Sequence, residues 1–286
     1  MTVALAHRPP VISSELLAML MRRLRVQSGI KLDSTQAVIA RKIGERMLVL
    51  GIDTPQEYLS LLDNSISARA EWLALTDLLT INQTRFFRQP EAIELVASYL
   101  GNQFIAAVDA PEEIAFWSAG CSTGQELYSL AMVVDRFIRR NQPTVEWHGI
   151  GTDLSFQAIA SGQSGRYDEA SISCIPATYR REYVNSLGEG EFSIDEELLV
   201  RTHLFHSNLL HVNSAPFADF NVIFCQNVLI YFDQETRFWV IDQLVERLRH
   251  GGLLILGAGE DSRWSHPLMK RAPCPGVCAY KKLEVQ

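Results

Sequence analysis

The residues that could do chemistry fall in four short segments, each directly after an apolar run that is typical of a strand. These segments are the loop 118–124, Asp153, the pair Asn208 and Leu209, and residues 225–232 with Gln226, Asn227 and Tyr231. Small residues let the backbone approach a ligand, and an acidic residue at a strand end binds ribose hydroxyls in nucleotide folds. The segment that begins with Asn208 and Leu209 could present amide groups to the edge of an adenine ring. Together, at strand ends and in this order, the segments favour an adenosine-containing ligand without pyrophosphate.

Each of these segments also has a purely structural interpretation. Gly120 and Gly124 have the spacing Gly-x-x-x-Gly rather than that of a dinucleotide fingerprint, and a plain strand-to-helix turn favours glycine as well. Asp153 could instead cap the helix expected after Ser155. Asn208 could be an ordinary turn residue, and an aromatic residue at a strand end is often part of the core. The prediction of a binding site therefore depends on the four segments in combination.

The elements that must position these residues differ between the two parts of the chain. Helices are expected from Ser13 or Ser14 to Gly29, from Asp33 to Gly51, from Thr54 through Leu62, and over 68–79. After residue 112, helix-like stretches alternate with strands expected at 114–117, 147–151, 222–225, 253–256 and 277–280. This alternation predicts an α/β fold with a mostly parallel, doubly wound sheet. We expect an all-α domain at 1–80, the α/β domain at 81–286, and a small antiparallel β insertion at about 186–206.

Composition excludes several classes of protein. A chain of 286 residues that is 47% hydrophobic and 21% charged is typical of a globular protein with a real core. Its apolar runs are much shorter than the ~20 residues of a membrane span, and its amino terminus lacks the core of a signal peptide, so we expect a cytoplasmic protein without membrane insertion. The cysteines and histidines show no regular ligand spacing, so no metal site is expected.

The charge of the chain is unevenly distributed. The formal net charge of −7 argues against a nucleic-acid partner, because neutralising phosphates needs a basic face. Residues 1–50 nevertheless hold 8 basic and 3 acidic groups. This basic amino-terminal part could contact an acidic partner.

Three blocks of the sequence resemble signature motifs of the chemotaxis receptor methyltransferases, the CheR family. They are Asn82–Arg88, which reads Asn-Gln-Thr-Arg-Phe-Phe-Arg, Ser118–Ser129, and Phe224–Phe232. The resemblance covers nearly the whole chain, and the first block is far more specific than any glycine loop. It implies methyl transfer from S-adenosyl-L-methionine to glutamate side chains of chemoreceptor-type signalling proteins, with S-adenosyl-L-homocysteine as product. The implied partner is the cytoplasmic helical domain of such a receptor.

The resemblance also assigns residues by position. The cofactor contacts would be Asn82, Thr84, Arg88, Glu126, Asp153, Asn208, Leu209, Gln226 and Asn227. Arg88 and Tyr231 would lie near the transferred methyl group as catalytic residues. Arg88 could hold a carboxylate of the cofactor or of the substrate, although by itself it would be interpreted as a surface arginine. Glu126 would hold the cofactor's ammonium group or backbone, and Asp153 its ribose.

Three features depart from the family pattern. The family block Gly-Glu-Glu-Pro-Tyr-Ser reads Gly-Gln-Glu-Leu-Tyr-Ser at 124–129, where Glu126 is retained. The family block Gly-His-Ser-Glu reads Gly-Ala-Gly-Glu at 257–260, so the resemblance does not define the backbone geometry there. The helix expected to face the receptor carries Arg41, Lys42 and Arg46, and Glu45 interrupts them. We expect these three cations to bind the partner. The alternative is a solvated face with one ion pair, which contributes a few tenths of a kcal/mol.

The altered receptor-facing helix favours a receptor outside standard flagellar chemotaxis, for example a pilus-motility sensor of the PilK-like branch. In some members of the family, a small β insertion of this kind binds the carboxy-terminal tail of a receptor. The hairpin expected near 187–191 is short, so we expect that the protein does not depend on such a tail. Two other functions compete with methylation of receptor glutamates. One is a non-catalytic adaptor of the same fold, and the other is a nucleic-acid or small-molecule methyltransferase. Methyltransferases that modify the amino groups of bases use a motif of the type Asn-Pro-Pro-Tyr. Residues 227–231 lack both of its prolines, which argues against the second alternative.

Overall fold

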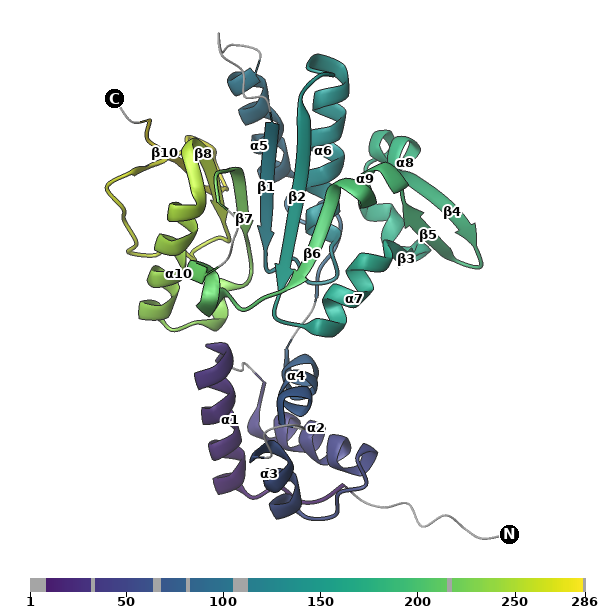
Figure 1. Ribbon diagram of the computed structural model, residues 1–286, viewed down its shortest axis with the longest axis vertical. Helices are drawn as coiled ribbons and strands as arrows, with labels where there is room; N and C mark the ends of the chain where they lie inside the picture. Colours follow the sequence, from purple (N-terminus) through teal and green to yellow (C-terminus); the bar gives the residue numbers. More distant parts are fainter. Residues whose placement is uncertain are drawn as a thin grey trace. The chain divides into compact units, whose positions relative to one another are not determined.

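The structure is a computed structural model that describes residues 9–31, 34–63, 68–80, 83–104, 113–214 and 218–284. It divides into two compact units, Met1–Ile81 and Asn82–Gln286, which are described separately here (Figure 1).

The first unit consists of helices in the part of the chain that the structure describes. They are α1 (Ser14–Ser28), α2 (Gln36–Val49), α3 (Pro55–Asp63) and α4 (Ala68–Leu79), so the helices predicted from periodicity are confirmed. The side chain of Ser13 caps α1, and Gly29 ends it in the left-handed region with φ 75°. Asp33, the expected start of the second helix, lies outside the described residues. Apolar side chains from all four helices form one core, which includes Leu20, Ile43, Tyr58 and Leu75.

The second unit is built on a seven-stranded sheet with the order β6-β2-β1-β7-β8-β10-β9. Its parallel strands are β6 (Thr202–His206), β2 (Glu146–Asp153), β1 (Glu113–Ala119), β7 (Phe220–Cys225) and β8 (Leu248–Leu256). The strands β10 (Cys278–Lys282) and β9 (Met269–Arg271) extend it in antiparallel pairing. Strand β7 is buried at every position, as is usual for a strand covered on both faces. The predicted doubly wound, mostly parallel sheet is confirmed.

Helices between the parallel strands cover the sheet (Figure 1). Helix α6 (Gln125–Asn141) packs with α5 (Pro90–Phe104) and against β1 and β2, and α7 (Phe156–Ser164) packs on β2 and β6. Helix α10 (Gln234–Arg247) packs on β8. From β1 the chain moves outward to β2 and β6, and it then returns to β7 and continues to β8 in the opposite direction. Right-handed crossovers therefore place α6 and α10 on opposite faces, with the switch point between β1 and β7.

The predicted antiparallel insertion is confirmed, but its bounds differ from the expected 186–206. The small sheet has the order β3-β5-β4 and consists of β3 (Arg166–Asp168), β5 (Glu191–Ile194) and β4 (Val184–Gly188). The apolar run 198–200, which was expected to belong to it, lies in helix α9 (Glu196–Arg201). Asp195 caps this helix because its side chain accepts a hydrogen bond from the amide of Glu197. The following residues form β6, the edge strand of the main sheet.

The described part of the second unit contains four further short helices, namely η1 (Glu169–Cys174), α8 (Ala177–Tyr183), η2 (Leu209–Ser214) and η3 (Leu229–Tyr231). Buried Asp135 links α6 to its neighbours, because its carboxylate accepts hydrogen bonds from Trp147 Nε1 at 3.1 Å and from the Tyr183 hydroxyl at 2.9 Å.

Within the described ranges, no helix has the length and apolar composition needed to cross a membrane. The same ranges contain no cluster of three or more histidine, cysteine, aspartate or glutamate side chains that could hold a metal ion.

Candidate functional site

The loops after β1 and β7 meet at the switch point of the sheet. Gly120 has φ 88°, and a Cβ added there would overlap Cγ2 of Val228 from the loop after β7. The amides of Gly120 and Cys121 donate to the carbonyl oxygen of Thr152 at 2.7 and 2.9 Å, which joins the loop to the end of β2. Glycine is therefore required at position 120, because the backbone is left-handed and leaves no room for a side chain.

Asp153 connects the loops after β1 and β2. Its Oδ2 accepts from the amide of Ser122 at 2.8 Å, and its Oδ1 accepts from the amide of Ser155 at 2.8 Å. The capping interpretation of Asp153 is wrong, because the N-cap of α7 is Ser155, whose hydroxyl accepts from the amide of Ala158 at 3.0 Å. A carboxylate offers about four lone-pair sites, so a single acidic side chain can accept from several donors at once.

Asn208 shapes the turn after β6. Its Oδ1 accepts from the amide of Leu210 at 2.9 Å, and its carbonyl oxygen accepts from the amide of His211 at 2.9 Å. The amide of Ser207 donates to the carbonyl oxygen of Asp153 at 2.9 Å. The side chain of Asn208 therefore has the turn-forming role that the simpler interpretation predicts, and the turn lies beside the end of β2.

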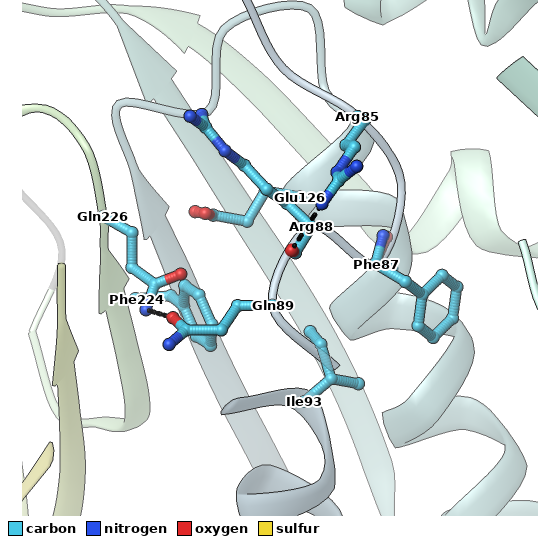
Figure 2. A pocket seen from close by; sticks show the side chains of 9 residues that line it. Arg85, Phe87, Arg88, Gln89, Ile93, Glu126, Phe224 and Gln226 are labelled. Atoms are coloured by element: carbon cyan, nitrogen blue, oxygen red, sulfur yellow. Dashed lines mark hydrogen bonds between the residues drawn. The ribbon is translucent and has the colours of Figure 1, made fainter. Parts of the chain in front are cut away.

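A pocket lies between the segment before α5, the start of α6 and the end of β7. Its lining residues are Arg85, Phe87, Arg88, Gln89, Ile93, Glu126, Ser129, Phe224 and Gln226 (Figure 2). The pocket brings together Arg88, Glu126 and Gln226, three of the predicted site residues, from three distant parts of the sequence. Thr84 is half-buried just before this segment, and Asn82 lies outside the described residues.

The carboxyl group of Glu126 carries the most distinctive electrostatics of the pocket. Its Oε1 accepts from the hydroxyl of Ser118 at 2.7 Å. Burial raises the pKa of Glu126 to about 8, and the carboxyl group of Glu260 adds to the rise, whereas the Ser118 hydrogen bond and the Arg88 charge oppose it. A carboxyl group in this state would be stabilised as an anion by a cation placed beside it. The observation fits a ligand with an ammonium group.

The Phe86–Phe87 pair fixes the segment that carries the arginines. Both rings are buried, and Phe86 packs edge-on against Tyr167 with ring centres 4.9 Å apart. Phe87 has a left-handed backbone with φ 47°, and its amide donates to the hydroxyl of Ser129 at 3.0 Å. The exposed Arg88 follows directly, so the buried aromatic pair anchors the backbone just before the residue that presents its guanidinium group.

Two arginines lie at this turn. Arg85 donates through Nη2 to the carbonyl oxygen of Arg88 at 3.4 Å (Figure 2). Arg88 donates through Nη1 to the carbonyl oxygen of Gln83 at 3.1 Å. Guanidinium groups hold carboxylates through paired donors. The pocket therefore contains two permanent cations beside one carboxyl group whose pKa is raised.

The end of β7 supplies the opposite wall of the pocket. Gln226 donates through Nε2 to Oε1 of Gln89 (Figure 2). The same nitrogen donates to the carbonyl oxygen of Leu256 at 3.1 Å. Asn227 has φ 61°, a left-handed conformation that asparagine tolerates better than most residues. Tyr231 is half-buried at the end of the short helix η3 (Leu229–Tyr231). The structure thus places Gln226 in the pocket wall, and Asn227 and Tyr231 in the loop that follows it.

Several residues of the site were not predicted from the sequence. They are Ser118, which binds Glu126, Ser129, which holds the Phe87 amide, and Arg85 and Gln89 in the pocket wall. The serines lie inside the second motif block, and Gln89 directly follows the first. Position in or next to a motif was the only available signal, because the contacts of Ser118, Ser129 and Gln89 join residues 8, 42 and 137 positions apart and form only in the folded chain.

The cations predicted to bind a partner have intramolecular partners in the first unit. Arg41 forms the expected ion pair with Glu45 at 2.6 Å, and Lys42 Nζ donates to the carbonyl oxygen of Leu78 at 2.7 Å. Arg46 departs from the expected exposed face, because it binds Glu71 through Nε at 3.1 Å and Nη2 at 2.7 Å. Glu71 is only 4% exposed, and a buried carboxylate needs a charged partner. Partner binding by these cations stays a prediction.

The strand order and the site define the class of protein. A glycine loop after β1, an acid at the end of β2 and a raised-pKa carboxyl group in the adjoining pocket lie around the switch point of a Rossmann-like sheet. This arrangement is the one expected of a methyltransferase that uses S-adenosyl-L-methionine. The chain belongs to the CheR methyltransferase family. The model of the CheR methyltransferase SAM-binding domain matches residues 82–273, and that of the all-alpha domain matches residues 15–80.

Curated relatives match along most of their length. The chain is 27% identical over 275 residues to a chemotaxis protein methyltransferase of Borreliella burgdorferi, covering 95% of each chain. It is 30% identical to chemotaxis protein methyltransferase 1 of Pseudomonas aeruginosa, covering 81% of this chain and 85% of the relative. It is 29% identical to the chemotaxis protein methyltransferase of Escherichia coli, covering 89% and 86%.

Proposed function

We propose that the protein is a protein-glutamate O-methyltransferase that acts on chemoreceptor-type signalling proteins. It transfers a methyl group from S-adenosyl-L-methionine to a glutamate side chain and leaves S-adenosyl-L-homocysteine. The observation that carries the proposal is the pair Arg85 and Arg88 beside Glu126, whose pKa is raised to about 8. The two arginine side chains suit a ligand that carries carboxylate groups. The methionine end of the cofactor carries one carboxylate, and a substrate glutamate carries another. Relatives named chemotaxis protein methyltransferases support the pathway.

The chemistry needs positioning more than proton transfer. The cofactor supplies an electrophilic methyl group on a sulfonium sulfur. A glutamate side chain with a pKa of about 4.3 is already a carboxylate at neutral pH, so it attacks without a general base. The protein therefore has to hold the carboxylate in line and exclude water, which is catalysis by proximity and orientation. Arg88 can hold a carboxylate through two donors, and Tyr231 can direct its hydroxyl or ring edge to the reacting centre.

The remaining site residues hold the cofactor in this proposal. Glu126 binds the ammonium group, and the carboxylate of Asp153 accepts hydrogen bonds from the ribose hydroxyls. The turn at Asn208 and Leu209 lies on the adenine side, next to the end of β2. The contacts assigned to Asn82, Thr84, Gln226 and Asn227 come from the family resemblance.

The helical unit contacts the cytoplasmic helical domain of the receptor in this proposal. Arg41 is exposed, and its surface ion pair with Glu45 is of a kind that contributes little to stability, so a stronger anionic partner could replace Glu45. Arg46 is already bound to the buried Glu71. We therefore assign the direct contacts to Arg41 and Lys42, and a supporting role within the unit to Arg46.

Transfer of a labelled methyl group to a purified receptor cytoplasmic domain tests the proposal. The wild-type protein should incorporate label that is released at alkaline pH, because the product is an ester. Arg88→Ala and Tyr231→Phe should each lower the rate at least about tenfold, as losses of transition-state contacts do. Full rates in both variants would contradict their assigned roles. Label on DNA or RNA, with none on the receptor, would contradict the substrate class.

A further inference from the structure

The turn that carries Tyr231 is held on its amide side by a buried carboxylate. Glu260, which is 1% exposed, accepts through Oε1 from the amide of Ile230 at 3.2 Å. Its Oε2 accepts from the amide of Gly257 at 2.6 Å, at the end of β8. One side chain thus ties η3 to the neighbouring strand, and it stands in the block 257–260 where the sequence left the geometry open.

The same turn is held on its carbonyl side by a guanidinium group. Arg237 from α10 donates through Nε to the carbonyl oxygen of Leu229 at 3.0 Å and through Nη2 to that of Phe232 at 3.3 Å. These two carbonyl groups flank Tyr231 and its neighbour. Glu260 and Arg237 together therefore engage the donors and the acceptors of the turn's backbone.

The surrounding backbone leaves little freedom for this arrangement. A Cβ added at Gly257 would overlap Oε2 of Glu260 and lie 3.1 Å from the amide nitrogen of Asn227. Asn227 is itself in the left-handed region. Burial raises the pKa of Glu260, while hydrogen bonds from the amides of Gly257, Ile230 and Leu229 and the charge of Arg237 favour its anion. The loops after β7 and β8 are thus joined by hydrogen bonds to the buried carboxylate of Glu260.

A turn of three residues cannot hold its own shape without such contacts, because a single 3₁₀ turn has few internal hydrogen bonds. We propose that Glu260 and Arg237 are positioning residues for methyl transfer, which fix the backbone of residues 229–232 so that Tyr231 points at the reacting centre. The proposal rests on the proposed function, because it gives Tyr231 a role in the reaction. Glu260 and Arg237 themselves need not touch the substrate or the cofactor.

A double-mutant cycle of Glu260→Gln with Tyr231→Phe distinguishes positioning from general stabilisation. Glutamine keeps the size of the side chain but replaces one acceptor oxygen with an NH₂ group, so one backbone amide loses its partner. We expect Glu260→Gln to lower kcat about tenfold or more in the wild-type background, and less than about twofold when Tyr231 is already phenylalanine. The dissociation constant of S-adenosyl-L-homocysteine should not rise more than about twofold, because the turn acts on the reaction and loss of the Glu260 charge, which helps to raise the pKa of Glu126, favours binding of the ammonium group.

Asp135→Asn is the matched control. Asp135 is also a buried carboxylate with several donors, but it links α6, β2 and α8 rather than the turn. It should lower the unfolding midpoint without a selective loss of kcat. Arg237→Lys provides a second test if Glu260→Gln fails to fold, because lysine can still donate to one of the two carbonyl groups. It should show the same dependence on Tyr231 with a smaller loss of rate.

Three results with Glu260→Gln would overturn the positioning role. They are an unchanged kcat in Glu260→Gln, an equal loss of rate in both backgrounds, or a parallel loss of affinity for S-adenosyl-L-homocysteine. If Tyr231→Phe keeps the full rate in an enzyme that still methylates the receptor, Tyr231 has no role and the positioning proposal fails while the proposed function stands. If the wild-type protein methylates no receptor, the proposed function fails first.

Discussion

The pH dependence of cofactor binding follows from the environment of Glu126. In the protein without ligand, burial raises the pKa of this carboxyl group to about 8, with Ser118 as its hydrogen-bond donor. In the proposed complex the cofactor's ammonium group lies beside it and favours the carboxylate. Binding therefore lowers the pKa of Glu126 and releases a proton. By linkage, affinity must rise with pH until the free protein is itself ionised.

The expected magnitude can be worked out from that pKa. With a pKa of about 8, the ionised fraction of Glu126 in the free protein is roughly one tenth at pH 7 and one hundredth at pH 6. The α-amino group of S-adenosyl-L-homocysteine, with an ordinary pKa near 8, stays protonated at both values and contributes almost nothing to the difference. Affinity for this product should therefore fall about tenfold from pH 7 to pH 6, which corresponds to about 1.4 kcal/mol.

Isothermal titration with S-adenosyl-L-homocysteine measures this effect directly. Repeating the titration at pH 7 in buffers of different ionisation enthalpy should show release of close to one proton per ligand bound. Glu126→Gln keeps a side-chain oxygen for the Ser118 hydroxyl but cannot ionise, so its affinity should be weaker and nearly independent of pH in this range. Equal wild-type affinity at pH 6 and pH 7, or an unchanged slope in the variant, would refute the assignment of Glu126 to the ammonium group.

Two stability predictions follow from other contacts. Gly120→Ala should lower the free energy of unfolding of the α/β unit by about 1–3 kcal/mol in urea, because the new Cβ meets Val228 on a left-handed backbone; an unchanged transition would show that the loop after β1 is not held as described. Glu71→Gln should destabilise the helical unit by about 2 kcal/mol because the partly buried Arg46 loses its anion. Glu45→Gln, which breaks only an exposed pair, should cost less than about 0.5 kcal/mol, and equal costs in the two variants would contradict this assignment.

Periodicity predicted most of the fold because its signals are local. The helical spacing of the amino-terminal part and the alternation of apolar runs with amphipathic stretches both depend on near neighbours in the chain. The run 198–200 was assigned to the β insertion because a short apolar run fits a strand or a buried helix turn equally well. The helix-capping role of Asp195, which decides the matter, is visible in the sequence only as one acidic residue among several.

The site was predictable where one residue type carries the chemistry. Asp153 was found by its charge and its position after a strand, whereas Glu126 came from the resemblance to the CheR family, and the structure places them at a strand end and in a pocket. The contacts Ser118–Glu126, Gln89–Gln226 and Arg46–Glu71 were not predicted. The last two join residues 137 and 25 positions apart, so they depend on the assembled tertiary structure.

The position of the transferred methyl group tests the central claim most directly. A chemoreceptor cytoplasmic domain would be incubated with the protein and isotopically labelled S-adenosyl-L-methionine, digested, and examined by peptide mass spectrometry. We expect the label on glutamate side chains, as an ester that alkaline treatment removes, and its absence when Arg88→Ala replaces the wild-type protein. Label that resists alkali, or that lies on residues other than glutamate, would contradict the account.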